Sequence, residues 1–79
     1  MSTIDTVRTI VESQAGLSVP AAELTEDQDL FEAGMTSHKS VSVMMTLEDE
    51  FDLEFPAELL TKSTFTSLRS ITDAVDSLA

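Results

Sequence analysis

The chain of 79 residues contains no cysteine, which excludes disulfide bonds, thiolate metal sites and redox chemistry by the protein's own side chains. Long apolar runs are missing as well. No segment approaches the roughly 20 apolar residues of a membrane span, and the start, MSTIDTVRTI, lacks the apolar run of a signal peptide. We therefore expect a cytoplasmic protein that does not enter membranes and holds its fold by apolar packing.

Basic residues are scarce: four Lys and Arg stand against fifteen Asp and Glu, for a net charge of −11. Such a charge repels nucleic acid and anionic membranes and attracts basic protein surfaces over a distance. A chain of this length buries only about 60 to 65% of its unfolded surface, which leaves little interior for a dry active-site pocket. We expect one monomeric domain over residues 1–79 that serves other proteins and is not an enzyme.

The first half predicts one helix and a long connection. Ser2 or Thr3 would cap the helix, and Gly16 would end it in a left-handed conformation. Its apolar positions are Ile4, Val7, Ile10 and Val11. From residue 17 to residue 36 the helical spacing fades, so a long connection is expected. The side chains that would hold it to the core are Leu17, Val19, Leu24, Leu30 and Phe31.

A second helix is predicted to follow this connection, with Thr36 or Ser37 as its cap and Asp52 at its exit. Its core face would consist of Val41, Met44, Leu47 and Phe51. Val43 and Met45 would then flank that face and be partly exposed. Lys39 and the acidic residues 49 and 50 would point away from the core.

The remaining segments predict two more helices and no strand. Pro56 suits the first position of a short third helix that runs to Leu60. Phe65 leads into a fourth helix, capped by Thr66 or Ser67. The apolar positions of that helix are Leu68, Ile71, Val75 and Leu78. No repeat and no linker rich in proline or glycine divides the chain.

Ser37 is the most informative residue, because it stands at the start of the second helix, just after the acidic, glycine-containing turn DLFEAG. A hydroxyl there is accessible to another enzyme. Its own hydrolase chemistry is not favoured: His38 points about 100° away on a helix, and the G-x-S-x-G elbow is absent. A calcium loop starting at Asp27 also fails, because its sixth position is Glu32 and its twelfth is His38. No catalytic or metal-binding residue is therefore expected.

Around Ser37 stands an ordered set of residues: Asp29, Leu30, Phe31, Glu32, Gly34, Ser37, Val41, Leu47, Glu48, Glu50, Phe51, Glu54, Pro56 and Phe65. This set resembles the phosphopantetheine-binding carrier proteins, which include acyl and peptidyl carrier proteins. This resemblance implies an all-α, acyl carrier protein-like four-helix bundle with a short third helix and a long loop between helices one and two. It also implies that a phosphopantetheinyl transferase uses Mg²⁺ and coenzyme A to attach 4′-phosphopantetheine to Ser37, whose arm then holds cargo as a thioester.

The segments SHKSV and FDLEFPAELL are most similar to stand-alone aminoacyl carrier proteins. That similarity implies loading with a small amino acid by an amino acid:carrier protein ligase, a relative of seryl-tRNA synthetases, and delivery to a downstream acceptor enzyme. Many relatives have Asp-Ser-Leu where this chain has Thr36, Ser37 and His38, which makes the neighbours of Ser37 candidates for partner recognition. The partner-binding candidates are Thr36, His38, Lys39, Val43, Met45 and Glu48.

Two alternatives stay open on the sequence. The cargo could be a fatty or polyketide acyl chain, since apolar and methionine side chains could shelter one, although such residues are usually ordinary core. The chain could also be an unmodified, acidic helical interaction module in which Ser37 only caps a helix.

Overall fold

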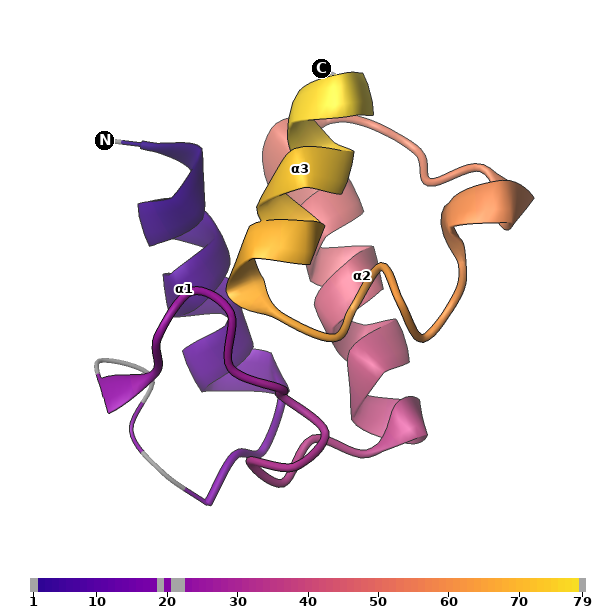
Figure 1. Cartoon of the computed structure of the whole chain (residues 1–79). Coiled ribbons are helices and arrows are strands. Elements are labelled where there is room, and N and C mark those ends of the chain that lie inside the picture. Colours follow the sequence, from indigo (N-terminus) through magenta and orange to yellow (C-terminus); the bar gives the residue numbers. More distant parts are fainter. Residues whose placement is uncertain (1, 19, 21–22, 79) are drawn as a thin grey trace.

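The computed structural model describes residues 2–18, 20 and 23–78, which form three α-helices and one short 3-10 helix (Figure 1). The elements are α1 (Thr3–Gln14), α2 (Ser37–Phe51), η2 (Ala57–Leu59) and α3 (Leu68–Leu78). No strand forms in these described ranges, so the all-α prediction is confirmed for them. None of the helices found there is long and apolar enough to cross a membrane.

Helix α1 contacts both α2 and α3, and it runs antiparallel to them (Figure 1). The predicted start and end of α1 are both confirmed. Ser2 Oγ accepts a hydrogen bond from the backbone N–H of Asp5 at 3.4 Å, and Gly16 follows the helix with a φ of +64°. The buried side chains of α1 are Val7, Ile10 and Val11, with Ile4 packed against the core.

The connection between α1 and α2 contributes its own side chains to the core. Leu24 and Leu30 are buried as predicted, and Leu17 and Phe31 pack against the core. Ala33 and Met35 are buried as well, which the sequence reasoning did not predict. Val19, also expected in the core, lies outside the described residues.

Hydrogen bonds tie this connection to α1 and to the start of α3. The backbone N–H of Leu30 donates to the carbonyl oxygen of Thr66 at 2.6 Å. Arg8 Nη1 donates to the carbonyl oxygen of Leu24 at 2.8 Å. Arg69 forms ion pairs with the carboxylates of Asp27, at 2.7 Å, and Glu26, at 3.3 Å. These contacts hold a segment without regular helix in a defined path, and that path leads to Ser37.

The predicted core face of α2 is confirmed in part, since Met44 and Phe51 pack against the core. Val43 and Leu47 are fully buried, whereas Val41 is 50% exposed. Apolar residues at positions 41, 43, 44 and 45 spread over most of the helix circumference, so spacing alone did not identify the buried side. Helix α1 packs on α2, and the buried face bears Val43, whereas Val41 lies outside it.

In the last third of the chain α3 forms as predicted, but the predicted short third helix is present only as the three-residue 3-10 helix η2. Pro56 precedes η2 in an extended conformation (ψ 158°), whereas it was expected to be the first helical residue. Ser67 caps α3: its Oγ accepts from the backbone N–H of Ser70 at 3.1 Å, and its own N–H donates to Ser70 Oγ at 3.0 Å. The buried residues of α3 are Leu68, Ile71, Ala74 and Val75.

Candidate functional site

Ser37 is the first residue of α2, and its side chain is exposed. The capping role belongs to the preceding residue: Thr36 Oγ1 accepts a hydrogen bond from the backbone N–H of Lys39 at 3.1 Å. No hydrogen bond to the Ser37 hydroxyl occurs among the residues that the structure describes. Ser37 is therefore positioned by the helix start without being used to build it.

The turn before Ser37 is fixed by Asp29 and Gly34. Asp29 Oδ1 accepts from the backbone N–H groups of Phe31, at 2.8 Å, and Glu32, at 3.3 Å, and so closes the turn. Gly34 has a φ of +118°, and a Cβ atom there would lie 3.1 Å from the backbone nitrogen of Ser18. Both the positive φ and the close approach favour glycine here, and the turn leads directly into α2.

The residues after Ser37 are exposed but differ in what they contact. His38 is exposed on the first turn. Lys39 is also exposed, and its stem lies over Gly16, at 3.6 Å from the position of a Cβ atom. Ser40 Oγ donates to the carbonyl oxygen of Ser37 at 2.6 Å, so this second hydroxyl is already engaged with the helix backbone.

Beside Ser37 lies a groove of about 400 Å³ between α2 and the segment that follows η2. Ser37 and Ser40 lie on one side of it and Thr61 on the other, while most of the other lining residues are apolar. Lys62 Nζ lies 5.0 Å from the centroid of the Phe31 ring, a cation–π distance. The lining consists of Phe31, Ser37, Ser40, Val41, Met44, Leu60, Thr61, Lys62 and Phe65.

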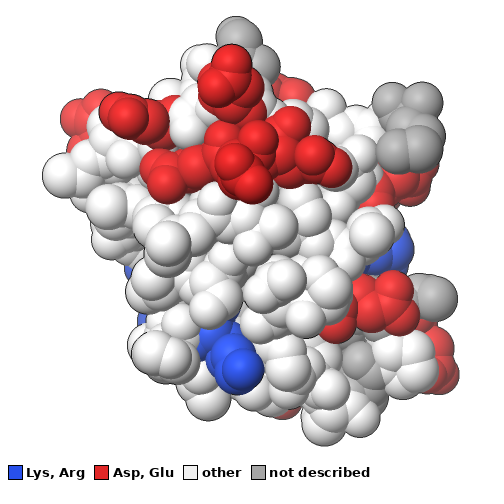
Figure 2. Space-filling view, turned by 180° about the vertical axis from the view of Figure 1, so that it is seen from behind, with Lys and Arg blue, Asp and Glu red and all other residues white. Residues whose placement is uncertain are grey.

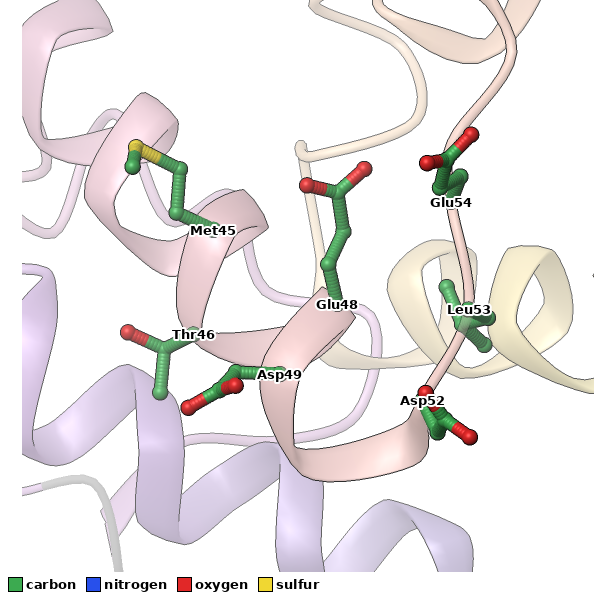
Figure 3. Close-up of a pocket in the computed structure, with 7 residues that line it drawn as sticks. All are labelled: Met45, Thr46, Glu48, Asp49, Asp52, Leu53 and Glu54. Carbon is green, nitrogen blue, oxygen red and sulfur yellow. The ribbon is translucent and has the colours of Figure 1, made fainter.

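Acidic side chains gather at the other end of α2, where they form most of one edge of the face seen in Figure 2. The helix has no acidic residue in its first turn and no basic residue in its last. Near its C-terminus a shallow hollow separates α2 from the segment that leaves it (Figure 3). The hollow is lined by Met45, Thr46, Glu48, Asp49, Asp52, Leu53 and Glu54.

Two of the predicted partner-binding residues have internal roles. The prediction that Val43 binds a partner at the surface is wrong, because its side chain is fully buried in the core. Glu48 is half-buried, and its Oε2 accepts a hydrogen bond from the backbone N–H of Phe55 at 2.9 Å. Met45, at 60% exposed, remains available for contact. Sequence reasoning missed Val41 and Leu60, which are 50% and 48% exposed beside the groove.

The arrangement suits a phosphodiester on Ser37. The N–H groups at a helix start have no partner within the helix, and the helix dipole favours a negative group there. Phosphates bind at helix N-termini for this reason. Lys39, two residues away, adds a positive charge. Within the described residues no cluster of three or more His, Cys, Asp or Glu is placed to hold a metal ion.

A family model described as a phosphopantetheine attachment site matches residues 5–75 of this chain. The chain belongs to this family. It is therefore a carrier protein on which 4′-phosphopantetheine is the prosthetic group, and the matched range contains the exposed helix start described above.

Individual relatives of this phosphopantetheine carrier agree with the match. The chain is 37% identical over 70 residues to an aminoacyl carrier protein of Agrobacterium fabrum, covering 89% of this chain and 84% of the relative. It also superposes on one chain of a crystal structure. That structure is an engineered Bradyrhizobium japonicum glycine:[carrier protein] ligase complexed with a carrier protein from Agrobacterium tumefaciens and ATP. That match has a TM-score of 0.92 and 34% identity and covers 96% of this chain and 99% of the other. A solution structure of an Agrobacterium tumefaciens protein gives a TM-score of 0.73 at 36% identity, with 92% and 88% covered.

Proposed function

We propose that this phosphopantetheine carrier is an aminoacyl carrier protein, with the arm on Ser37 and a small amino acid as cargo. The observation that carries the proposal is the exposed Ser37 hydroxyl, unused by the helix cap, within the range matched by the family model. The amino acid cargo is supported by the 37% identity to an aminoacyl carrier protein.

The attachment step needs little from the carrier itself. Ser37 Oγ would attack phosphorus in the pyrophosphate of coenzyme A. One P–O bond would form as the bond to the departing adenosine bisphosphate breaks, and the serine proton would pass to the transferase. A separate phosphopantetheinyl transferase with Mg²⁺ would supply the catalysis. Ser40 is the poorer acceptor, because its hydroxyl donates to the carbonyl oxygen of Ser37 at 2.6 Å.

Loading would fall to an amino acid:carrier protein ligase related to seryl-tRNA synthetases. A relative at 34% identity is a carrier protein complexed with a glycine:[carrier protein] ligase, which supports a ligase of this kind as partner and glycine as the first cargo to test. A downstream enzyme would then accept the amino acid from the thioester. Since the ligase and the acceptor enzyme both act on the end of the arm, the flexible tether presents that end to each of them at high effective concentration.

The partner surface that we propose lies around the start of α2 and the groove. His38 and Lys39 are exposed beside Ser37, and Thr36 shapes the helix start between them and the turn. Val41, Met45 and Leu60 add exposed apolar area, which favours protein contact. The acidic end of α2 would attract a basic surface on the same partners.

In fold terms we propose a carrier-type four-helix bundle in which the segment around η2 replaces a full third helix. The chain would act as a monomer, without catalysis of its own. Its location would be the cytoplasm, where coenzyme A and ATP are both available to the modifying and loading enzymes.

A fatty or polyketide acyl cargo is the second candidate, and the groove of about 400 Å³ beside Ser37 favours it. Apolar pockets of this size accept small ligands. Loading assays separate the two cargoes: an amino acid with ATP and an aminoacyl ligase is compared with acyl-coenzyme A donors on the same armed protein.

Intact mass spectrometry tests the attachment. Protein co-expressed with a phosphopantetheinyl transferase should gain the mass of one phosphopantetheine group. Ser37→Ala should remain unmodified and folded, while Ser40→Ala, the matched control, should be modified like the wild type. An adduct that persists in Ser37→Ala would place the attachment at another residue. No adduct on the wild type with several transferases would favour the unmodified interaction module.

A further inference from the structure

The groove beside Ser37 carries a positive charge, although the protein as a whole is strongly acidic. Lys62 is the one charged residue among those that line it, in a chain whose net charge is −11. No carboxylate of the described residues forms an ion pair with Lys62. Its ammonium group instead lies 5.0 Å from the centroid of the Phe31 ring, which is itself part of the groove wall. A positive charge is thus held at a groove that Ser37 lines.

The cargo of an aminoacyl carrier differs from an acyl cargo in the same respect, since the free α-amino group of an aminoacyl thioester is largely protonated near neutral pH. Repulsion between two like charges about 4 Å apart lowers a binding constant about fivefold even in bulk water. The reduction is larger beside a wall of low dielectric constant. The ring of Phe31 and the side chains of Val41 and Met44 form such a wall.

We propose that Lys62 excludes the cationic end of an aminoacyl cargo from this groove and so keeps the loaded arm in solvent. A neutral acyl group on the same arm meets no such repulsion and enters. Lys62 is then a specificity-determining residue. It keeps an aminoacyl group in solvent, where the next enzyme can reach it, whereas a fatty acyl chain would enter the groove and be shielded. This inference rests on the proposed attachment of the arm to Ser37.

Two opposing effects make the proposal open to test. Apolar walls already disfavour an ammonium group, because its desolvation is unfavourable. The overall charge of −11 attracts it to the protein. If desolvation alone governs entry, the charge at Lys62 has no influence, and replacing it changes nothing.

The experiment compares two arms that differ only in charge. A phosphopantetheinyl transferase attaches glycyl and propionyl arms to Ser37 from coenzyme A analogues with an amide in place of the labile thioester. In the propionyl arm a CH₃ group replaces the NH₃⁺ group of glycyl, so size is matched. Methyl NMR shifts of Val41, Met44 and Leu60 report occupancy of the groove. We expect the propionyl arm to shift these methyl signals, with an occupancy at least about fivefold above that of the glycyl arm.

Three variants then assign the effect. Lys62→Met keeps the apolar stem and should raise glycyl occupancy at least about fivefold, and Lys62→Glu should raise it further. Lys62→Arg is the matched control: it keeps the positive charge at the groove and should leave glycyl occupancy as low as in the wild type. Added salt should raise glycyl entry in the wild type and lower it in Lys62→Glu.

Equal glycyl and propionyl occupancy in the wild type would overturn the proposal, as would a glycyl occupancy that Lys62→Met leaves unchanged. Intact mass, measured on every sample first, separates this from failure of the proposed function. If Ser37 accepts no arm, both proposals fall. If it accepts the arm and the groove ignores cargo charge, only the role of Lys62 falls.

Discussion

Glu48 Oε2 accepts a hydrogen bond from the backbone N–H of Phe55 at 2.9 Å, and this contact fastens the last turn of α2 to the segment that leaves it. Phe55 is only 6% exposed, and its ring packs on that of Phe65 with 5.6 Å between centroids. The carboxylate therefore satisfies a donor at the edge of the core, although its place near a helix C-terminus is electrostatically unfavourable.

Removing the acceptor at position 48 should destabilise the fold. In Glu48→Ala the amide of Phe55 loses its partner, and an unsatisfied buried donor costs about 1 to 3 kcal/mol. Glu48→Gln keeps an acceptor oxygen and removes the charge, so its free energy of unfolding should stay within about 1 kcal/mol of the wild type. Urea unfolding followed by circular dichroism measures both. Equal losses in the two variants would show that the charge, and not the hydrogen bond, matters.

Thr36 and Ser37 should separate stability from modification. Thr36→Ala removes the oxygen that accepts from the N–H of Lys39 and should lower the free energy of unfolding by about 0.5 to 2 kcal/mol. Ser37→Ala removes an exposed hydroxyl that is not the cap, so the change should stay within about 0.5 kcal/mol. Thermal unfolding of the unmodified proteins measures this difference. A larger loss in Ser37→Ala than in Thr36→Ala would mean that the capping roles are reversed.

The sequence predicted the helices well because their boundaries have local causes. Ser2 caps α1, Gly16 takes the left-handed conformation, and Asp52 ends α2 with a φ of +53°. Each of these signals acts within one turn of its helix, so it is visible in the sequence. The position of Ser37 at a helix start followed from the same local reasoning.

The surface around the site could not be predicted in the same way, because it depends on contacts between distant segments. Val41 and Val43 have equal apolar character, and only the tertiary packing of α2, on α1 and the rest of the core, decides that Val43 is buried. Glu48 finds the N–H of Phe55 seven residues later, through a turn whose shape the sequence did not reveal. Lys62 and Phe31 meet only in the folded chain.

The two glycines near the site should differ in what they tolerate. A Cβ atom at Gly16 would meet only the flexible stem of Lys39, at 3.6 Å, so Gly16→Ala should cost about 1 to 2 kcal/mol for the left-handed backbone. Gly34→Ala would combine a φ of +118° with a contact of 3.1 Å to the backbone nitrogen of Ser18. Its backbone cost alone is about 1 to 3 kcal/mol.

Gly34→Ala should therefore be the less stable of the two variants in urea unfolding. It should also slow phosphopantetheine transfer, because the turn it distorts positions Ser37, whereas Gly16→Ala should affect transfer less. A Gly34→Ala protein as stable as Gly16→Ala would show that the close approach to Ser18 relaxes readily.

Substitutions of apolar residues on α2 should affect either partner binding or stability, depending on whether the side chain is exposed or buried. Met45→Ser removes a 60% exposed side chain and should change the free energy of unfolding by no more than about 0.5 kcal/mol, yet raise the KM of the loading ligase for the carrier. Leu47→Ala empties a fully buried position and should cost about 2 to 5 kcal/mol of stability. Loading kinetics and urea unfolding measure the two effects. An unchanged KM for Met45→Ser would exclude this residue from the docking surface.

The acidic residues at the end of α2 should lower the stability of the fold and speed association with a basic partner. Asp49 and Glu50 are exposed in the last turns, where negative charge opposes the helix dipole. Asp49→Asn and Glu50→Gln should each raise the free energy of unfolding by about 0.3 to 1 kcal/mol. The same changes should slow association with a basic partner and weaken its dependence on salt. Ligase binding at two ionic strengths measures this, with Glu12→Gln on α1 as a control of equal charge change. If Glu12→Gln slows association equally, total charge and not this end of α2 attracts the partner.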